Sequence, residues 1–214
     1  MKYLLVQMNN LVSEIETGIE FLKNNDARLR AIIEVTPPCS IKLQKRYFLR
    51  LIEIIISQQL SVKAADSIFN RFIAHFGEAV KPSTILKTSP ELIRSFGLST
   101  SKVNFIKDVA EKIENKQLKL KQFYHMTEEE IRKELIQIKG IGVWSCDMYL
   151  MFTLGKLNIL PVHDLGIRKG VQKIYHLREL PDETKIRTIA KKNNWHPYCS
   201  IASWYLWRSL EMES

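Results

Sequence analysis

The spacing of the apolar residues constrains the fold of this chain more than any other feature. In stretches such as FLRLIEIIISQQL (residues 48–60) and ADSIFNRFIAHFG (65–77), apolar residues recur every three or four positions, which is the period of one helix face. No stretch alternates apolar and polar residues between hairpin turns, as a strand would. The sequence therefore predicts an all-α protein.

Capping residues and glycines mark where the helices begin and end. Ser89 and Thr127 each stand where a helix N-cap is expected, and Gly77, Gly97 and Gly155 stand where helices should stop. Together with the periodicity, these signals predict helices at residues 11–24, 27–35, 44–58, 62–76, 90–96, 101–115, 128–138, 143–154, 165–175, 182–193 and 198–211.

The charge of the chain narrows the classes of partner. Its 214 residues include 32 Lys and Arg against 23 Asp and Glu, a net charge of +9, which is typical of proteins that meet phosphate backbones or anionic membranes. No segment approaches the roughly 20 apolar residues of a membrane span, and the first residues lack a signal-peptide core. We therefore expect a soluble, cytoplasmic protein with no membrane partner. The isolated cysteines Cys39, Cys146 and Cys199 predict half-buried thiols without a disulfide, zinc or iron–sulfur site.

A pair of glycines lies between two of the expected helices, in ELIQIKGIGVWSCDMYLMFTLG (134–155). Gly140 and Gly142 flank one apolar residue, and this spacing permits a tight turn that exposes peptide N–H groups to a phosphate. A lone Gly-x-Gly is also found in ordinary helical hairpins, so this segment alone leaves both interpretations open.

One carboxylate stands among basic residues in LPVHDLGIRKG (160–170). Asp164 would weaken a site that only holds polyanions, because it repels phosphate as strongly as its neighbours attract it. It either carries chemistry or caps the helix expected from Leu165, and one aspartate can do both.

These two motifs together resemble a known signature. LxxIKGIGxW, followed about twenty residues later by PVHDLGIRKG, resembles the helix–hairpin–helix and Gly/Pro-Asp signature of the HhH-GPD superfamily of base-excision DNA glycosylases. The chain is most similar to the alkylbase type (3-methyladenine DNA glycosylase II), with which it shares ISQQLSVKAA (56–65), FGLSTSKVNFI (96–106) and WHPYCSIASWYLWR (195–208). This resemblance implies two helical lobes with the active site in the cleft between them, formed by residues 48–156 and by residues 1–47 with 157–214.

The resemblance also implies an activity. The expected enzyme is a monomer that flips alkylated purines out of double-stranded DNA and hydrolyses their N-glycosidic bond, acting on 3-methyladenine, 7-methylguanine and, by extension, hypoxanthine. Asp164 would be the catalytic residue, stabilising the sugar cation or directing a water to it. Bifunctional relatives carry a Schiff-base lysine where this chain has Trp144, so a monofunctional glycosylase is implied. The alternative is a non-catalytic helix–hairpin–helix DNA-binding protein, which has no use for Asp164 together with Trp207.

Further site residues follow from their positions in the family motifs. Trp144 and Trp207 would line the base pocket, where indole faces attract cationic purines, together with Met148, at a position where relatives can carry a tyrosine. Leu60 would be the wedge that fills the gap left by the base, although it also fits an ordinary leucine at a helix end. Gly140, Gly142 and Lys102 would contact the DNA backbone.

No cofactor is expected apart from a monovalent cation at the hairpin. The resemblance implies that Na⁺ or K⁺ could be held there by the backbone carbonyls of Ile136, Ile138 and Ile141. Trp195 and Trp204 are expected to pack in the core instead of serving a site.

Overall fold

The chain divides into two compact units. The computed structural model describes residues 2–212, with side chains from residue 10 onward. The central unit is Gln44–Tyr149, and the terminal unit comprises the residues up to Leu43 together with those from Leu150. The lobe boundaries expected at residues 48 and 156 lie a few residues further along the chain than these divisions.

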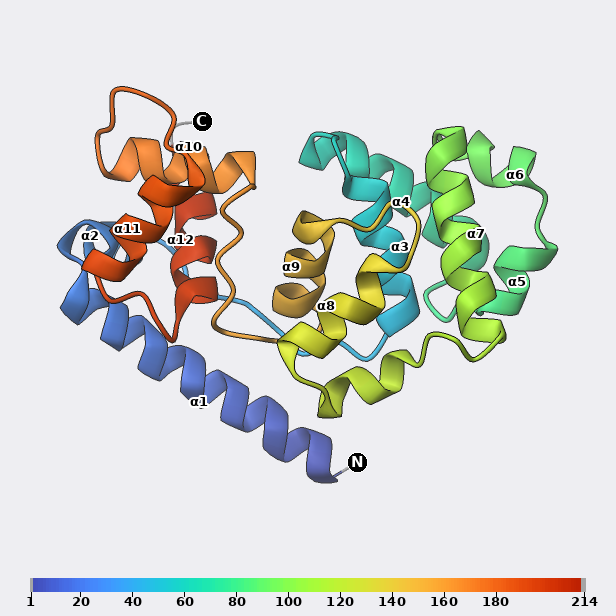
Figure 1. Cartoon of the computed structure of the whole chain (residues 1–214), viewed down its shortest axis with the longest axis horizontal. Coiled ribbons are helices and arrows are strands. Elements are labelled where there is room, and N and C mark those ends of the chain that lie inside the picture. The colour runs from blue at the N-terminus through green and yellow to red at the C-terminus, as the bar shows by residue number, and fades with distance from the viewer. Residues whose placement is uncertain (1, 213–214) are drawn as a thin grey trace. The chain divides into compact units, whose positions relative to one another are not determined.

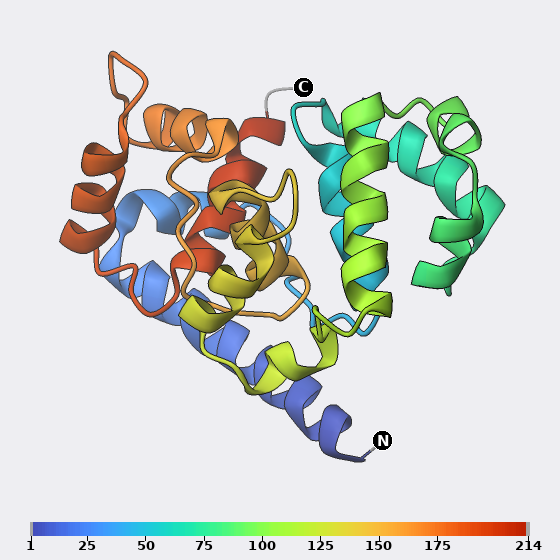
Figure 2. The same cartoon turned by 45° about the vertical axis from the view of Figure 1, so that its right-hand side comes forward.

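The central unit is built around one buried helix. Its elements are α3 (Tyr47–Ser57), α4 (Val62–Phe76), α5 (Pro82–Lys87), α6 (Pro90–Ser95), α7 (Thr100–Glu114), the 3₁₀ helix η1 (Leu120–His125), α8 (Glu128–Ile136) and the first part of α9 (Val143–Phe152). Ile52, Ile55 and Ile56 of α3 are fully buried, because α4, α7 and η1 all pack against this helix. In both cartoon views α7, in green, runs alongside α3, in cyan (Figures 1 and 2).

The terminal unit is built around α12 (Cys199–Glu211). The other elements are α1 (Lys2–Asn25), α2 (Ala27–Ile33), the end of α9, α10 (Leu165–Ile174) and α11 (Glu183–Lys192). Helix α12 contacts α1, α2 and α10, and the approach to α10 is so close that a Cβ at Gly170 would lie 2.6 Å from the carbonyl oxygen of Leu206. Trp195 and Trp204 are buried, which confirms their expected place in the core.

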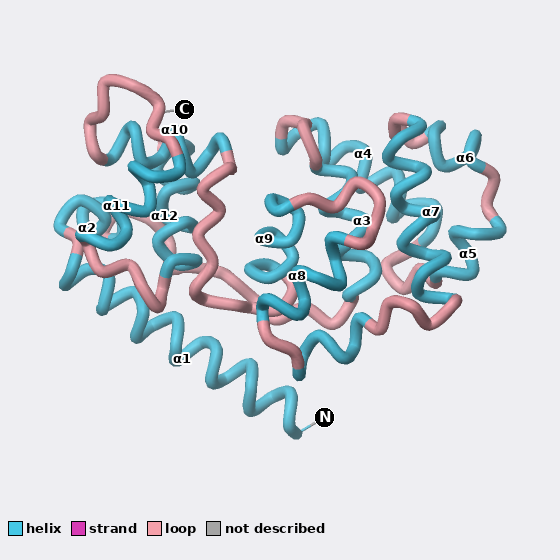
Figure 3. The backbone as a smooth tube through the Cα atoms, viewed as in Figure 1, coloured by secondary structure: helices cyan, strands magenta, loops and turns pink. Residues whose placement is uncertain are grey.

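The secondary structure confirms the all-α prediction. No strand occurs between residues 2 and 212, as the coloured tube also shows (Figure 3). Helices α5 and η1 are absent from the sequence-based prediction, and α1 begins earlier than expected. Within the described part of the chain, no helix has the length and hydropathy that crossing a lipid bilayer requires.

The three cysteines are more deeply buried than the sequence suggested. Cys39, Cys146 and Cys199 are free thiols with exposed fractions of 8%, 0% and 8%. Burial disfavours the charged thiolate and raises the pKa of each of these thiols to about 11.

Candidate active site

Asp164 is the N-cap of α10. Its backbone is extended (φ −72°, ψ 127°), and its Oδ1 accepts a hydrogen bond of 2.8 Å from the N–H of Ile167. This bond satisfies one of the amide donors that the first turn of a helix leaves without a backbone partner. The capping role considered from the sequence is therefore correct as the local role of Asp164.

Trp207 of α12 reaches the same carboxylate. Its indole Nε1–H donates to Oδ1 of Asp164 over 2.8 Å, and its ring lies 5.7 Å, centroid to centroid, from that of Phe152. Gly166 makes this approach possible, because a Cβ there would lie 2.7 Å from Cδ1 of Trp207 and 2.9 Å from Oδ1 of Asp164. The structure thus brings Asp164 and Trp207 together. Sequence reasoning did not select Gly166, although its place two residues after the aspartate was a usable signal.

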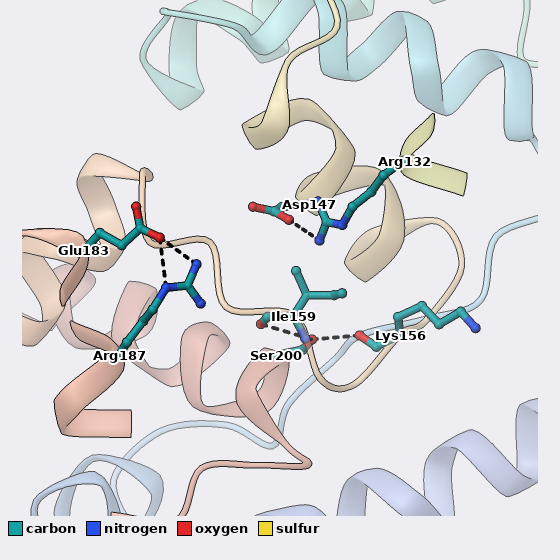
Figure 4. A network of polar contacts seen from close by, with 7 residues as sticks. All are labelled: Arg132, Asp147, Lys156, Ile159, Glu183, Arg187 and Ser200. Atoms are coloured by element: carbon teal, nitrogen blue, oxygen red, sulfur yellow. Dashed lines mark hydrogen bonds and ion pairs between the residues drawn. The ribbon is translucent and has the colours of Figure 1, made fainter. Parts of the chain in front are cut away.

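The loop that leads to Asp164 is fastened to α12 by a buried serine. The hydroxyl of Ser200 accepts the N–H of Ile159 at 2.9 Å and donates to the carbonyl of Lys156 at 2.7 Å (Figure 4). The backbone N–H of Ser200 also donates to the carbonyl of Leu157 at 2.9 Å. Because the same helix carries Ser200 and Trp207, it holds both the loop and the carboxylate at its end.

Basic residues that flank Asp164 in sequence make contacts with α11 and the loop before it. His163 Nε2 lies 3.6 Å from Glu183 Oε2, and Glu183 also pairs with Arg187 at 2.7 Å. The pair of Glu183 and Arg187 is drawn in Figure 4. Arg168 donates from Nε to the carbonyl of Pro181 at 2.8 Å. These contacts hold the side chains of His163 and Arg168 against α11 and the loop before it.

The helix–hairpin–helix segment lies in the central unit. Gly140 has φ +79°, in the left-handed region, and a Cβ there would lie 2.1 Å from the ring of Phe105 on α7. Gly142 differs, because a Cβ would meet no atom within 4 Å. The hairpin is braced by an ion pair of 2.6 Å between Arg132 of α8 and Asp147 of α9, seen in Figure 4. Of the two hairpin glycines, the backbone conformation and the packing thus require glycine at Gly140 and not at Gly142.

The residues before and between the hairpin glycines contact α7 and each other. Lys139 donates its backbone N–H to Oδ2 of Asp108 at 3.1 Å, and its Nζ lies 3.8 Å from Oδ1 of the same residue. Among the carbonyls expected to hold a cation, that of Ile138 accepts the N–H of Ile141 at 3.1 Å, and Ile136 is the last residue of α8. Cation binding by Ile136, Ile138 and Ile141 stays a prediction.

Trp144 and Met148 lie one turn apart on α9, so their side chains share a helix face. Trp144 is half-buried and Met148 is buried. Both belong to the central unit, whereas Asp164 and Trp207 belong to the terminal unit. The role of Trp144 and Met148 in a base pocket stays a prediction.

Leu60 and Lys102 lie at the C-terminal end of α3. Leu60 is 40% exposed in the turn between α3 and α4. The ammonium of Lys102 donates to the carbonyls of Ile56 and Gln58 at 2.8 and 2.9 Å, and burial lowers the pKa of Lys102. The lysine expected at a phosphate thus lies against the end of a helix.

The chain is similar to several known proteins. Residues 52–195 match the model of the HhH-GPD superfamily base excision DNA repair proteins. DNA-3-methyladenine glycosylase 1 of Schizosaccharomyces pombe is 31% identical over 94% of this chain and 89% of its own length. The protein YfjP of Bacillus subtilis is 33% identical to this chain. The match covers 86% of this chain and 66% of the length of YfjP. The fold is also similar to that of the Schizosaccharomyces pombe 3-methyladenine DNA glycosylase Mag1, whose structure is solved in complex with abasic DNA. The match has a TM-score of 0.84 and 28% sequence identity, and it covers 92% of this chain and 98% of the Mag1 chain.

Proposed function

Since the chain belongs to the HhH-GPD superfamily of base excision DNA repair proteins, we propose that it is a monofunctional DNA glycosylase releasing alkylated purines from double-stranded DNA. The observation that carries this proposal is the hydrogen bond of 2.8 Å between Trp207 and the Asp164 carboxyl group. A relative of known structure is bound to abasic DNA, which is the product of base release, and the net charge of +9 suits a DNA partner.

The proposed chemistry centres on Asp164. When the N-glycosidic bond breaks, its electron pair leaves with the purine and positive charge develops on the sugar, which a fixed carboxylate stabilises until water adds. Two hydrogen bonds hold one oxygen of Asp164, from Ile167 and from Trp207, so the group is oriented before substrate binds. A non-catalytic DNA-binding protein would need the hairpin but would have no use for this orientation.

The purine must leave the base stack before its bond to the sugar can be attacked. We place Leu60, exposed at its turn, in the gap that the base leaves, and the indole face of Trp207, whose Nε1–H is bonded to Asp164, against the flipped purine. Because N-alkylation puts positive charge on the purine ring, contact with indole faces favours the damaged base over the normal one.

The direct test is base release from duplexes that contain 7-methylguanine, 3-methyladenine, hypoxanthine or no damage. We expect the two cationic lesions to be released fastest, because only they gain from the indole faces. Chromatography of the free bases measures the rates. Tight binding to all four duplexes without release from any would instead support the non-catalytic alternative.

The hairpin glycines give a prediction with a built-in control. Gly140→Ala should lower the free energy of unfolding by about 2–4 kcal/mol, because alanine is strained at positive φ and its Cβ would overlap Phe105. Gly142→Ala should leave stability nearly unchanged, since its Cβ has room, yet weaken DNA binding for all sequences alike by blocking the approach of a phosphate. Denaturant unfolding and affinity for two unrelated duplexes measure both effects. Unchanged affinity in the Gly142 variant would remove this glycine from the DNA contact.

Strand scission should not follow base release. Trp144 stands where bifunctional relatives have a lysine, and the nearby Lys139 is directed to Asp108 in its own unit. Borohydride added during turnover should therefore trap no protein–DNA adduct, and the product should be nicked only after alkali. A trapped adduct would mean that another lysine reaches the sugar, and the monofunctional mechanism would be wrong.

A further inference from the structure

The turn that joins α3 to α4 has an unusual conformation for its sequence. Gln58 has φ −52° and ψ 128°, Gln59 has φ +55°, and the N–H of Leu60 donates to the carbonyl of Ser57 at 3.3 Å. These features match a type II turn, whose third residue is usually glycine because φ must be positive there. With Gln59 in that place, the turn needs support from the surrounding structure.

The turn presents apolar side chains to solvent. Leu60 is 40% exposed and Val62 is 79% exposed, on either side of Ser61, the N-cap of α4. Exposed apolar side chains at a strained turn are typical of a binding element and give no stability to the free protein. The position of the α3–α4 turn therefore depends on the polar contacts that its backbone and Gln58 make.

Lys102 supplies the first of these contacts. Its ammonium, on α7, donates both to Ile56 O in the last turn of α3 and to Gln58 O in the turn itself, at 2.8 and 2.9 Å. A cation suits this place, because the carbonyls at the end of a helix carry partial negative charge. One side chain therefore joins the end of α3 to the turn that follows it.

Gln58 supplies the second contact, toward the hairpin. Its Nε2 donates to the carbonyl of Gly140 at 2.8 Å and lies 3.0 Å from the hydroxyl of Ser145 on α9. Gln58 therefore has two partners. Its backbone carbonyl accepts a bond from Lys102, and its side chain donates a bond to the hairpin residue Gly140.

We propose that Lys102 and Gln58 are positioning residues, which set the α3–α4 turn at a fixed place relative to the hairpin so that Leu60 enters the DNA where the hairpin holds the backbone. This inference rests on the proposed glycosylase function. It gives Lys102 a role in extruding the base from a paired duplex, through the turn, and none in the chemical step or on a phosphate.

The test compares two substrates for Lys102→Met. One duplex carries the lesion opposite its normal partner, and the other carries the same lesion opposite an abasic site, where less pairing has to be broken. Unstacking and unpairing cost a few kcal/mol, so we expect the single-turnover rate on the paired lesion to fall by about 10- to 100-fold. On the unpaired lesion we expect a fall of less than about 3-fold, because little of that cost remains.

Lys107 offers a matched control on the same helix. Its ammonium donates to the carbonyl of Thr88 at 2.7 Å and to that of Ile85 at 3.4 Å, so it holds the end of α5 as Lys102 holds the end of α3. Lys107→Met removes the same kind of contact without touching the α3–α4 turn. It should leave the ratio of paired to unpaired rates unchanged, and Lys102→Arg should restore most of that ratio.

Equal losses on both substrates in Lys102→Met would overturn the proposal, and so would an unchanged rate on the paired lesion. The rates could also fall equally on both substrates while the log–log slope of DNA affinity against salt decreases by the amount expected for one phosphate contact. That result would assign Lys102 to the DNA backbone instead. If Lys102→Met does not fold, Gln58→Ala carries the same comparison. Wild-type protein inactive on both substrates would instead refute the proposed function itself.

Discussion

Asp164→Asn is expected to abolish base release, with a loss of at least about 100-fold in the single-turnover rate, while binding to lesion DNA persists or strengthens. The bonds from Ile167 and Trp207 both end on Oδ1, and an amide oxygen can accept both of them. The substitution therefore keeps the cap and the contact with α12 and removes the negative charge. Loss of that charge leaves the developing sugar cation unstabilised and removes a repulsion toward phosphate.

Single-turnover release of 7-methylguanine and equilibrium DNA binding measure the two effects separately. Asp182→Asn is the matched control, because Asp182 is the N-cap of α11 in the same unit and accepts a bond of 2.8 Å from the N–H of Lys185. That variant should keep full activity. Release by Asp164→Asn at near the wild-type rate would dismiss the catalytic assignment.

Asp26→Ala is expected to lower the free energy of unfolding by about 3–5 kcal/mol, through the loss of a buried, hydrogen-bonded carboxylate. Asp26 is 1% exposed and accepts bonds from the N–H groups of Arg28 and Leu29, from Nε1 of Trp195 and from the hydroxyl of Tyr175. Burial, and then the adjacent Asp26, raise the pKa of Tyr175, so its hydroxyl stays a donor. Truncation would leave two large aromatic side chains without their polar partner.

Urea unfolding measures this change. Asp182→Ala is again the control, because Asp182 is an exposed N-cap whose carboxylate accepts a hydrogen bond from Lys185 in the first turn of its own helix. This substitution should cost about 1 kcal/mol. Equal losses in the two variants would show that Asp26 acts only as the cap of α2. A larger loss in Asp26→Ala would show that it also anchors Tyr175, at the end of α10, and Trp195, just before α12.

Helix positions followed from the sequence where the helices were long and well capped. Helix α4 spans Val62–Phe76 as predicted, because its apolar period extends over four turns and Gly77 ends it at φ +70°. Helices α5 and η1 have six residues each, too few to show a helical period. Pro82, at the first position of α5, was the available signal.

In the candidate site, contacts between residues close in sequence could be predicted, whereas contacts between distant residues could not. The capping role of Asp164 was accessible from sequence, because a cap involves residues three apart. The bond from Trp207 to Asp164 joins residues 43 apart, and that from Lys102 to Ile56 joins residues 46 apart. Such bonds depend on how α12 packs on α10 and how α7 packs on α3, which periodicity does not encode. Motif resemblance placed Lys102 at the DNA, whereas packing places it beneath the α3–α4 turn.

The buried cysteines make this protein convenient for fluorescence work. With each thiol pKa raised to about 11, only on the order of one part in ten thousand is thiolate at neutral pH, and each side chain is at most 8% exposed. Maleimide dyes should therefore spare Cys39, Cys146 and Cys199. A cysteine introduced at Val62, which is 79% exposed, would carry the label alone, and the entry of the α3–α4 turn into DNA could be followed in real time in otherwise wild-type protein.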